Sequence, residues 1–149
     1  MYYSKTKEEY IDDFFTFKRN HLYAKPAPHK VIYYLTIIDA ITCGFIESNR
    51  FIFCPQLENK FLDNWERYIG NQTAYKANVF VPAFYSKTAP FYRLVDNESM
   101  PEKSTPCSSV KSFNKQYKFI EIDDDLFSYI KTDKSFSARL RVVLISSLV

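Results

Sequence analysis

The sequence contains only two glycines, Gly44 and Gly70, among its 149 residues. A glycine-rich phosphate loop and a dinucleotide-binding fold both need several glycines at fixed spacing, so this scarcity argues against both. Histidine is equally scarce, because His21 and His29 are the only two and none follows residue 29. The later part of the chain therefore cannot supply the histidines of an HNH-type metal finger.

Cysteine is also sparse. The three cysteines, Cys43, Cys54 and Cys107, are odd in number, far apart and in no C-x-x-C pair. This usage predicts reduced thiols and a cytoplasmic protein. No uncharged apolar run approaches about 18 residues, and no N-terminal segment has the pattern of an export signal. We therefore expect no membrane partner.

The composition that remains is that of a globular protein, with 46% hydrophobic, 25% charged and 18% aromatic residues. A chain of this length can bury a sizeable core, so residues 1–149 are expected to form one domain. The formal net charge of +3 permits nucleic-acid binding without indicating it.

The hydrophobic pattern predicts an α+β fold, a mostly helical single domain of about five helices with a few short antiparallel strands. The helices are expected over residues 5–19, 28–43, 55–69, 123–133 and 135–149. The strands are expected over residues 49–54, 89–97 and 117–122. Residues 71–87 and 97–112 are expected to be a connector and a loop. Asp123 is the expected N-cap of the fourth helix.

The second predicted helix opens with cations, although positive charge is unfavourable at a helix N-terminus. Pro28 suits the first helical position, and Ala27 would then be the N-cap, which is a poor capping residue. The next backbone N–H groups would lack a side-chain acceptor. An anion held by Lys30, His29 and Lys25 would satisfy them, and a nucleic-acid phosphate is the leading candidate. The alternative is that water satisfies these groups and the lysines are solvated.

A second candidate patch is the segment TAPFYRL, residues 88–94. Arg93 offers a planar fork for a phosphate or a guanine edge, and Tyr92 and Phe91 could stack on or pack against a ligand. The alternative is an ordinary strand with Phe91 and Leu94 in the core. The preceding connector mixes polar, aromatic and basic residues, as nucleic-acid loops and plain loops both do. Its members are Asn71, Gln72, Tyr75, Lys76 and Lys87.

No catalytic constellation stands out. Helix capping explains the three aspartates at 123–125, and the segment IEIDDD lacks the lysine of an Asp…Glu-x-Lys nuclease core. A zinc site from two histidines and two cysteines would need an irregular spacing. We therefore expect no cofactor, no metal and no enzymatic activity in these 149 residues. A metal-dependent nuclease is the disfavoured alternative.

The order of several motifs is familiar. APHK opens an apolar helix and is followed by a short predicted strand. After the strand come, in order, LENKFLDNW, APFYRL, IDDDLFSYI and LRVVLISSL. From about Tyr10 to its end, the chain resembles the N-terminal, DNA-binding half of a family of bacterial restriction endonucleases whose C-terminal half is an HNH nuclease. In characterised members this half is a sulfur-binding domain that recognises phosphorothioate-modified DNA. The resemblance therefore implies binding to double-stranded DNA, with or without a modification.

The resemblance also implies site residues. His29 and Lys30 would contact the DNA backbone, and the segment around Pro90 would form a shallow pocket for sulfur. Two positions depart from the family, because Ala89 replaces an aromatic residue and Arg93 replaces a small one. The family continues into a nuclease domain where this sequence stops. The predicted DNA-binding set is Lys25, His29, Lys30, Asn71, Lys87, Ala89, Pro90, Tyr92 and Arg93.

A second hypothesis stays open. The chain could be a protein-interaction or regulatory module that kept the fold and lost DNA recognition. Its apolar C-terminal segment LISSLV would then be a docking surface. If the predicted cations do not lie together on one face, this hypothesis gains support.

Overall fold

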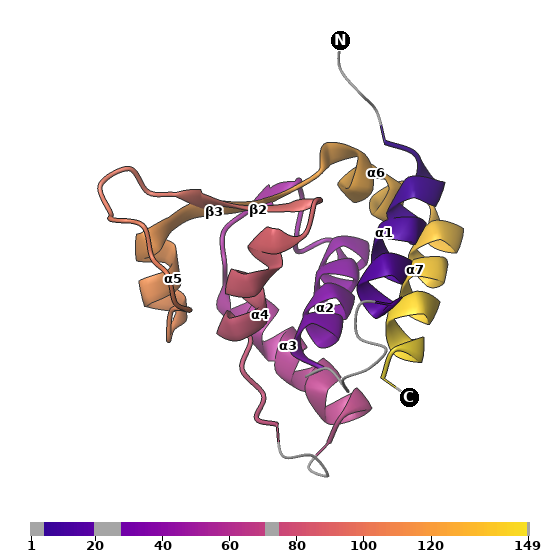
Figure 1. Ribbon diagram of the computed structural model, residues 1–149, viewed down its shortest axis with the longest axis horizontal. Helices are drawn as coiled ribbons and strands as arrows, with labels where there is room; N and C mark the ends of the chain where they lie inside the picture. Colours follow the sequence, from indigo (N-terminus) through magenta and orange to yellow (C-terminus); the bar gives the residue numbers. More distant parts are fainter. Residues whose placement is uncertain (1–4, 20–27, 71–74, 149) are drawn as a thin grey trace.

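The computed structural model describes residues 5–19, 28–70 and 75–148. Within them the chain forms seven α-helices, one 3-10 turn and three strands, arranged as a single α+β unit (Figure 1). In order they are α1 Lys7–Arg19, α2 His29–Cys43, β1 Arg50–Phe51, α3 Pro55–Tyr68, α4 Phe80–Tyr85, η1 Ser86–Thr88, β2 Tyr92–Asp96, α5 Val110–Gln116, β3 Tyr117–Ile122, α6 Asp124–Thr132 and α7 Lys134–Ser146. The predicted fold class is confirmed, with more helices than the sequence indicates.

The helix α2 is the centre of the fold. All of its residues from Val31 to Ile41 are buried, as expected of a helix that is apolar on all sides. It packs against α3, α4, α6 and α7. It ends at Gly44, whose φ of 88° is the left-handed conformation that glycine adopts most easily, and the Gly44 N–H bonds back to the carbonyls of Ala40 and Ile41.

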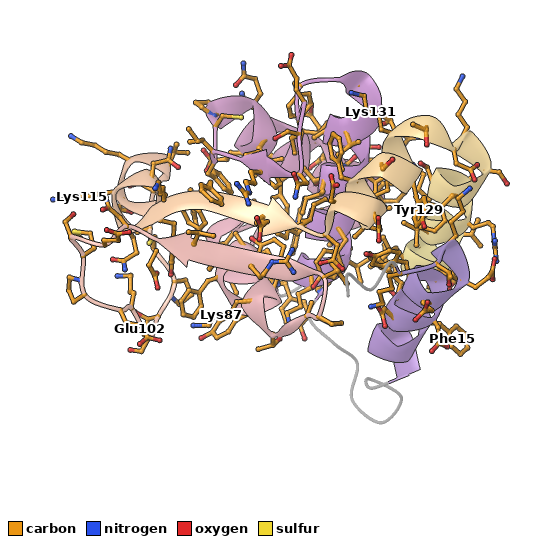
Figure 2. All side chains as sticks on the ribbon, turned by 90° about the horizontal axis from the view of Figure 1, so that it is seen from above. Phe15, Lys87, Glu102, Lys115, Tyr129 and Lys131 are labelled. Atoms are coloured by element: carbon orange, nitrogen blue, oxygen red, sulfur yellow. The ribbon has the colours of Figure 1, made fainter. Side chains whose placement is uncertain are left out.

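The three strands form an antiparallel sheet in the order β1-β3-β2. Tyr92, Ile120 and Ile122 are buried on its inner side, which faces the helices. Arg50 and Arg93 are exposed on the other side and flank Glu121 in the strand register. Figure 2 looks onto this outer face, across which no helix runs. The sheet therefore has one wet face, as antiparallel sheets commonly do.

Two short helices lie where the sequence predicts a connector and a loop. The helix α4 lies within residues 71–87, and its residues Phe80, Ala83 and Phe84 are buried, with α4 packed against α2. The helix α5 begins after Ser109, whose hydroxyl accepts a hydrogen bond from the Ser112 N–H in a capping box. Helices of six and seven residues show too few turns for a periodic pattern, so composition alone misassigned them.

Asp123 precedes α6 as predicted, but its side chain does not cap the helix. Its carboxylate instead accepts hydrogen bonds from the Tyr10 hydroxyl and from Arg93 Nη1, each at 2.8 Å. The expected cap is therefore a tertiary link between α1, β2 and the start of α6. None of the helices in the described ranges is long and apolar enough to cross a membrane.

Candidate nucleic-acid interface

The start of α2 is the first predicted site. The N-cap residue is Pro28 and not Ala27, so the helix begins one residue later than the sequence predicts. The Pro28 carbonyl accepts a hydrogen bond from the Ile32 N–H at 3.1 Å. No side chain of the described residues caps the helix, and its first turn holds no acidic residue. The positive end of the α2 dipole therefore has neither a capping oxygen nor a carboxylate from this part of the chain.

His29 connects this helix start to the segment that follows α3. Its Nε2 lies 2.7 Å from the carbonyl oxygen of Lys76. Because a carbonyl can only accept, Nε2 must carry the proton. The imidazole also packs 4.8 Å from the Trp65 ring and 5.9 Å from the Tyr75 ring, measured between centroids. His29 therefore acts as a positioning residue that holds Tyr75 and Lys76 at the start of α2.

Lys30 is half-buried in the first turn of α2. Burial lowers the pKa of its ammonium, and no carboxylate of the described residues offsets this by pairing with it. A partly desolvated charge without a counterion is unfavourable, and an external anion would relieve that cost. Lys30 is thus a cation with its charge available at a helix N-terminus.

Lys87 is exposed on η1, directly after α4. Its ammonium lies 3.9 Å from the centre of the Phe84 ring, which is a cation–π contact. It forms no ion pair with any carboxylate of the described residues. The ring fixes the position of Lys87 without neutralising its charge.

The Pro-Phe motif divides between surface and core. Pro90 is exposed and Ala89 is half-buried, in the turn between η1 and β2. Phe91 is buried, stacked on Phe14 at 4.7 Å and edge-on to Tyr34 at 5.5 Å. The surface part of the motif is therefore small and offers little apolar area to a ligand.

Tyr92 is a core residue, so the prediction that it stacks on a ligand is wrong. It is 1% exposed, and its hydroxyl donates to the Ala83 carbonyl at 2.7 Å. The Tyr33 hydroxyl, 2.8 Å away, must then donate to Tyr92. Burial raises the pKa of both phenols. Tyr92 fixes β2 onto α2 and α4, and it presents no face to solvent.

Arg93 is already occupied, which corrects the prediction that its fork is open for a phosphate. Its Nε donates to Glu121 at 2.8 Å and its Nη1 donates to Asp123 at 2.8 Å. Glu121 also accepts from Arg50 Nε at 2.7 Å, and hydrogen bonds from both arginines lower the pKa of this carboxyl. Both guanidinium charges are thus balanced on the outer face of the sheet.

The predicted cations in the described ranges have different surroundings. Arg93 lies in one row of the sheet with Glu121 and Arg50 and pairs with Glu121 and Asp123. Lys30 lies in the first turn of α2. Lys25 and Asn71 lie outside the described residues. The cluster that the structure assembles is Lys30, His29, Trp65, Tyr75 and Lys76, of which only Lys30 and His29 belong to the predicted set.

The predicted set omits Tyr75, Lys76 and Trp65. Trp65 is a core residue that is 5% exposed, and its ring also supports His29. A signal for the other two existed in the sequence, since an aromatic residue beside a lysine in a polar connector is typical of nucleic-acid loops. The pairing with His29 across 47 positions could come only from the fold.

Neither the models of known protein families nor the curated proteins give a significant match to this chain. No group of three or more metal-binding side chains occurs in the described ranges. The fold and the site therefore define a small α+β domain with an aromatic and basic cluster at the start of its central helix.

Proposed function

We propose that this chain binds duplex DNA and holds a backbone phosphate at the start of α2. The observation that carries the proposal is Lys30, a half-buried ammonium that has no carboxylate partner in the described residues and sits in the first turn of a helix without a side-chain cap. Backbone N–H groups and a lysine at a helix N-terminus are groups that proteins use for phosphate. Lys76 and Lys87 would add further phosphate contacts.

The resemblance to the DNA-binding half of HNH restriction endonucleases supports the same reading. It implies binding rather than catalysis for these residues, and a nuclease domain elsewhere or in a partner. Cys43, Cys54 and Cys107 are all free thiols, which fits a reducing compartment such as the cytoplasm.

The test is a binding titration with a short duplex at several salt concentrations. We expect the affinity to fall steeply with salt, because binding releases counterions from the DNA. Lys30→Gln should weaken binding by about fivefold, ~1 kcal/mol, and reduce the salt slope by about one. Lys131→Gln on α6 is the matched control, since it changes the net charge equally away from the site. The proposal fails if the wild-type protein shows no salt-dependent binding, or if both variants lose affinity equally.

A second titration tests whether the protein prefers phosphorothioate-modified DNA. Two duplexes that differ by one phosphorothioate should bind with affinities within about threefold of each other, because Ala89 and Pro90 offer little apolar surface to a sulfur atom. A preference well above this would assign the chain the modification specificity of the family that it resembles.

A second candidate function is binding of a protein partner. It is favoured by the pairing of Arg93 with Glu121 and Asp123 and by an open groove of about 480 Å³ beside β1. Phe45 and Ile52 on its walls are 38% and 63% exposed, and Ile46 and Leu57 are buried beneath. The segment LISSLV, the predicted docking surface, is less exposed than the walls of this groove. Leu144 is buried, and Ile145 and Leu148 pack against the core. If Ile52→Lys abolishes association with a copurifying protein and leaves DNA binding unchanged, the groove is the functional surface.

A further inference from the structure

Three aromatic rings form a line from the core to the surface at the start of α2. Trp65 is 5% exposed, His29 is half-buried, and Tyr75 is 43% exposed. The imidazole lies 4.8 Å from the Trp65 ring and meets the Tyr75 ring edge-on, at 5.9 Å and 88°. The array therefore ends in an aromatic ring that is accessible to solvent.

Tyr75 is held by more than its ring contact. The neighbouring carbonyl, that of Lys76, accepts the 2.7 Å hydrogen bond from His29 Nε2. The loop backbone is thereby tied to the first residue of α2, next to Lys30. A pre-positioned ring loses less conformational entropy when a ligand stacks on it, so more of the contact energy appears as affinity.

Two lysines lie next to this array in the sequence. Lys30 follows His29 and Lys76 follows Tyr75, and neither lysine pairs with a carboxylate of the described residues. Phe15 on α1 is equally exposed at 43%, and α1 and α7 carry the ion pairs Lys7–Asp133 and Arg139–Glu8. An exposed ring between cations is what proteins use to bind unpaired nucleic acid, because every base has a face that can stack.

We infer that Tyr75 stacks on an unpaired base of DNA while Lys30 and Lys76 hold the flanking phosphates. The inference rests on the proposed function, and it narrows the preferred substrate to DNA with a bulged or otherwise unpaired nucleotide. In a continuous duplex both faces of each internal base are covered by its neighbours. Only an unpaired base can offer a face to Tyr75.

The experiment compares three otherwise identical duplexes by fluorescence anisotropy: one fully paired, one with a single bulged thymidine, and one with an abasic residue at the bulge. The abasic duplex keeps the backbone distortion and removes the base. Wild-type protein should prefer the bulged thymidine to the abasic duplex by about tenfold. Tyr75→Phe should keep this preference, because the ring remains.

Tyr75→Ala should reduce the preference for the bulged over the abasic duplex to less than about twofold. Phe15→Ala is the matched control and should behave as wild type. If wild type binds the bulged and abasic duplexes equally, the inference about Tyr75 is wrong. Salt-dependent binding to the paired duplex in the same experiment would still support the proposed function. Absence of binding to all three would overturn both. An equal loss of preference in Phe15→Ala and Tyr75→Ala would overturn the assignment to Tyr75.

Discussion

Two parts of the molecule differ in how their cations are matched. On the outer face of the sheet and on the neighbouring helices, beside exposed lysines such as Lys118 and Lys131, six ion pairs join cations to carboxylates; the pairs are Arg50–Glu121, Arg93–Glu121, Arg93–Asp123, Lys5–Asp13, Lys7–Asp133 and Arg139–Glu8. We call the surface that carries these pairs the paired surface. At the start of α2 and in the segment after α3 that His29 contacts, Lys30 and Lys76 pair with no carboxylate of the described residues. We call this the unpaired cluster.

The comparison shows that residue type alone does not identify a binding cation. Arg93 has the side chain best suited to phosphate, yet its fork is used by Glu121 and Asp123. The ammonium of Lys30 lacks the planar, two-pronged hydrogen-bonding geometry of an arginine. Its charge, however, is not neutralised by a carboxylate of the described residues. Charges on the paired surface stabilise the folded state, and charges in the unpaired cluster are available for a ligand.

The largest expected effect is on the free energy of unfolding, and it concerns the carboxylate of Asp39, which lies inside the fold. Asp39 on α2 contacts Arg141 of α7 and accepts a 3.0 Å hydrogen bond from Asn64, with Lys60 3.9 Å away. Asp39→Asn leaves both cations without their carboxylate, which should cost about 3 kcal/mol of unfolding free energy. Urea denaturation measures this. Asp63→Asn, an exposed change on α3, is the control, and an equal cost in both variants would show that pairing inside the fold contributes nothing.

The next effect tests the paired surface. Glu121→Gln removes the carboxylate shared by two arginines and should cost about 1–2 kcal/mol. Because the folded-state pKa of Glu121 is lowered, its contribution is present above the ordinary value near 4.5 and is lost as pH falls through the folded-state pKa. Stability measured between pH 7 and pH 3 should therefore fall less steeply in Glu121→Gln than in wild type. Glu98→Gln, in the exposed loop after β2, should keep the wild-type slope.

A smaller effect separates the two regions directly. Arg93→Gln should lower the melting temperature and leave DNA affinity within about twofold of wild type, because its charge is already balanced. Lys30→Gln should do the reverse, with about a fivefold loss of affinity and little loss of stability. If Arg93→Gln weakens DNA binding more than Lys30→Gln does, the division between the two regions is wrong.

The smallest effect is a shift in pH dependence. Burial lowers the pKa of Lys30, so its ammonium loses its proton at a lower pH than an ordinary lysine does. DNA affinity should therefore decline at alkaline pH as Lys30 loses its charge. Lys30→Arg keeps its charge throughout this range, and its affinity should decline at higher pH than that of wild type. Identical alkaline profiles of the two proteins would contradict a charged contact through Lys30.

Much of the fold could be predicted from local signals. The five longest helices and the strand at 117–122 follow from hydrophobic periodicity and from the stops at Gly44 and Gly70. The helix α4 could not be recognised, because its six residues are held by packing of Phe80, Ala83 and Phe84 and not by a local pattern. Tyr92 was misplaced for a related reason, since the hydroxyl partners that allow its burial, Tyr33 and Ala83, belong to other elements.

The sequence by itself determined the helical core and the cationic start of α2, because burial of apolar residues at helical spacing and the absence of a capping side chain are local properties. Only the tertiary structure decided which cations remain available. It brought Glu121 and Asp123 to Arg93 and left Lys30 without a carboxylate among the described residues. It also set Tyr75 on His29. These outcomes depend on contacts between residues far apart in the chain, and such contacts exist only after the core has packed.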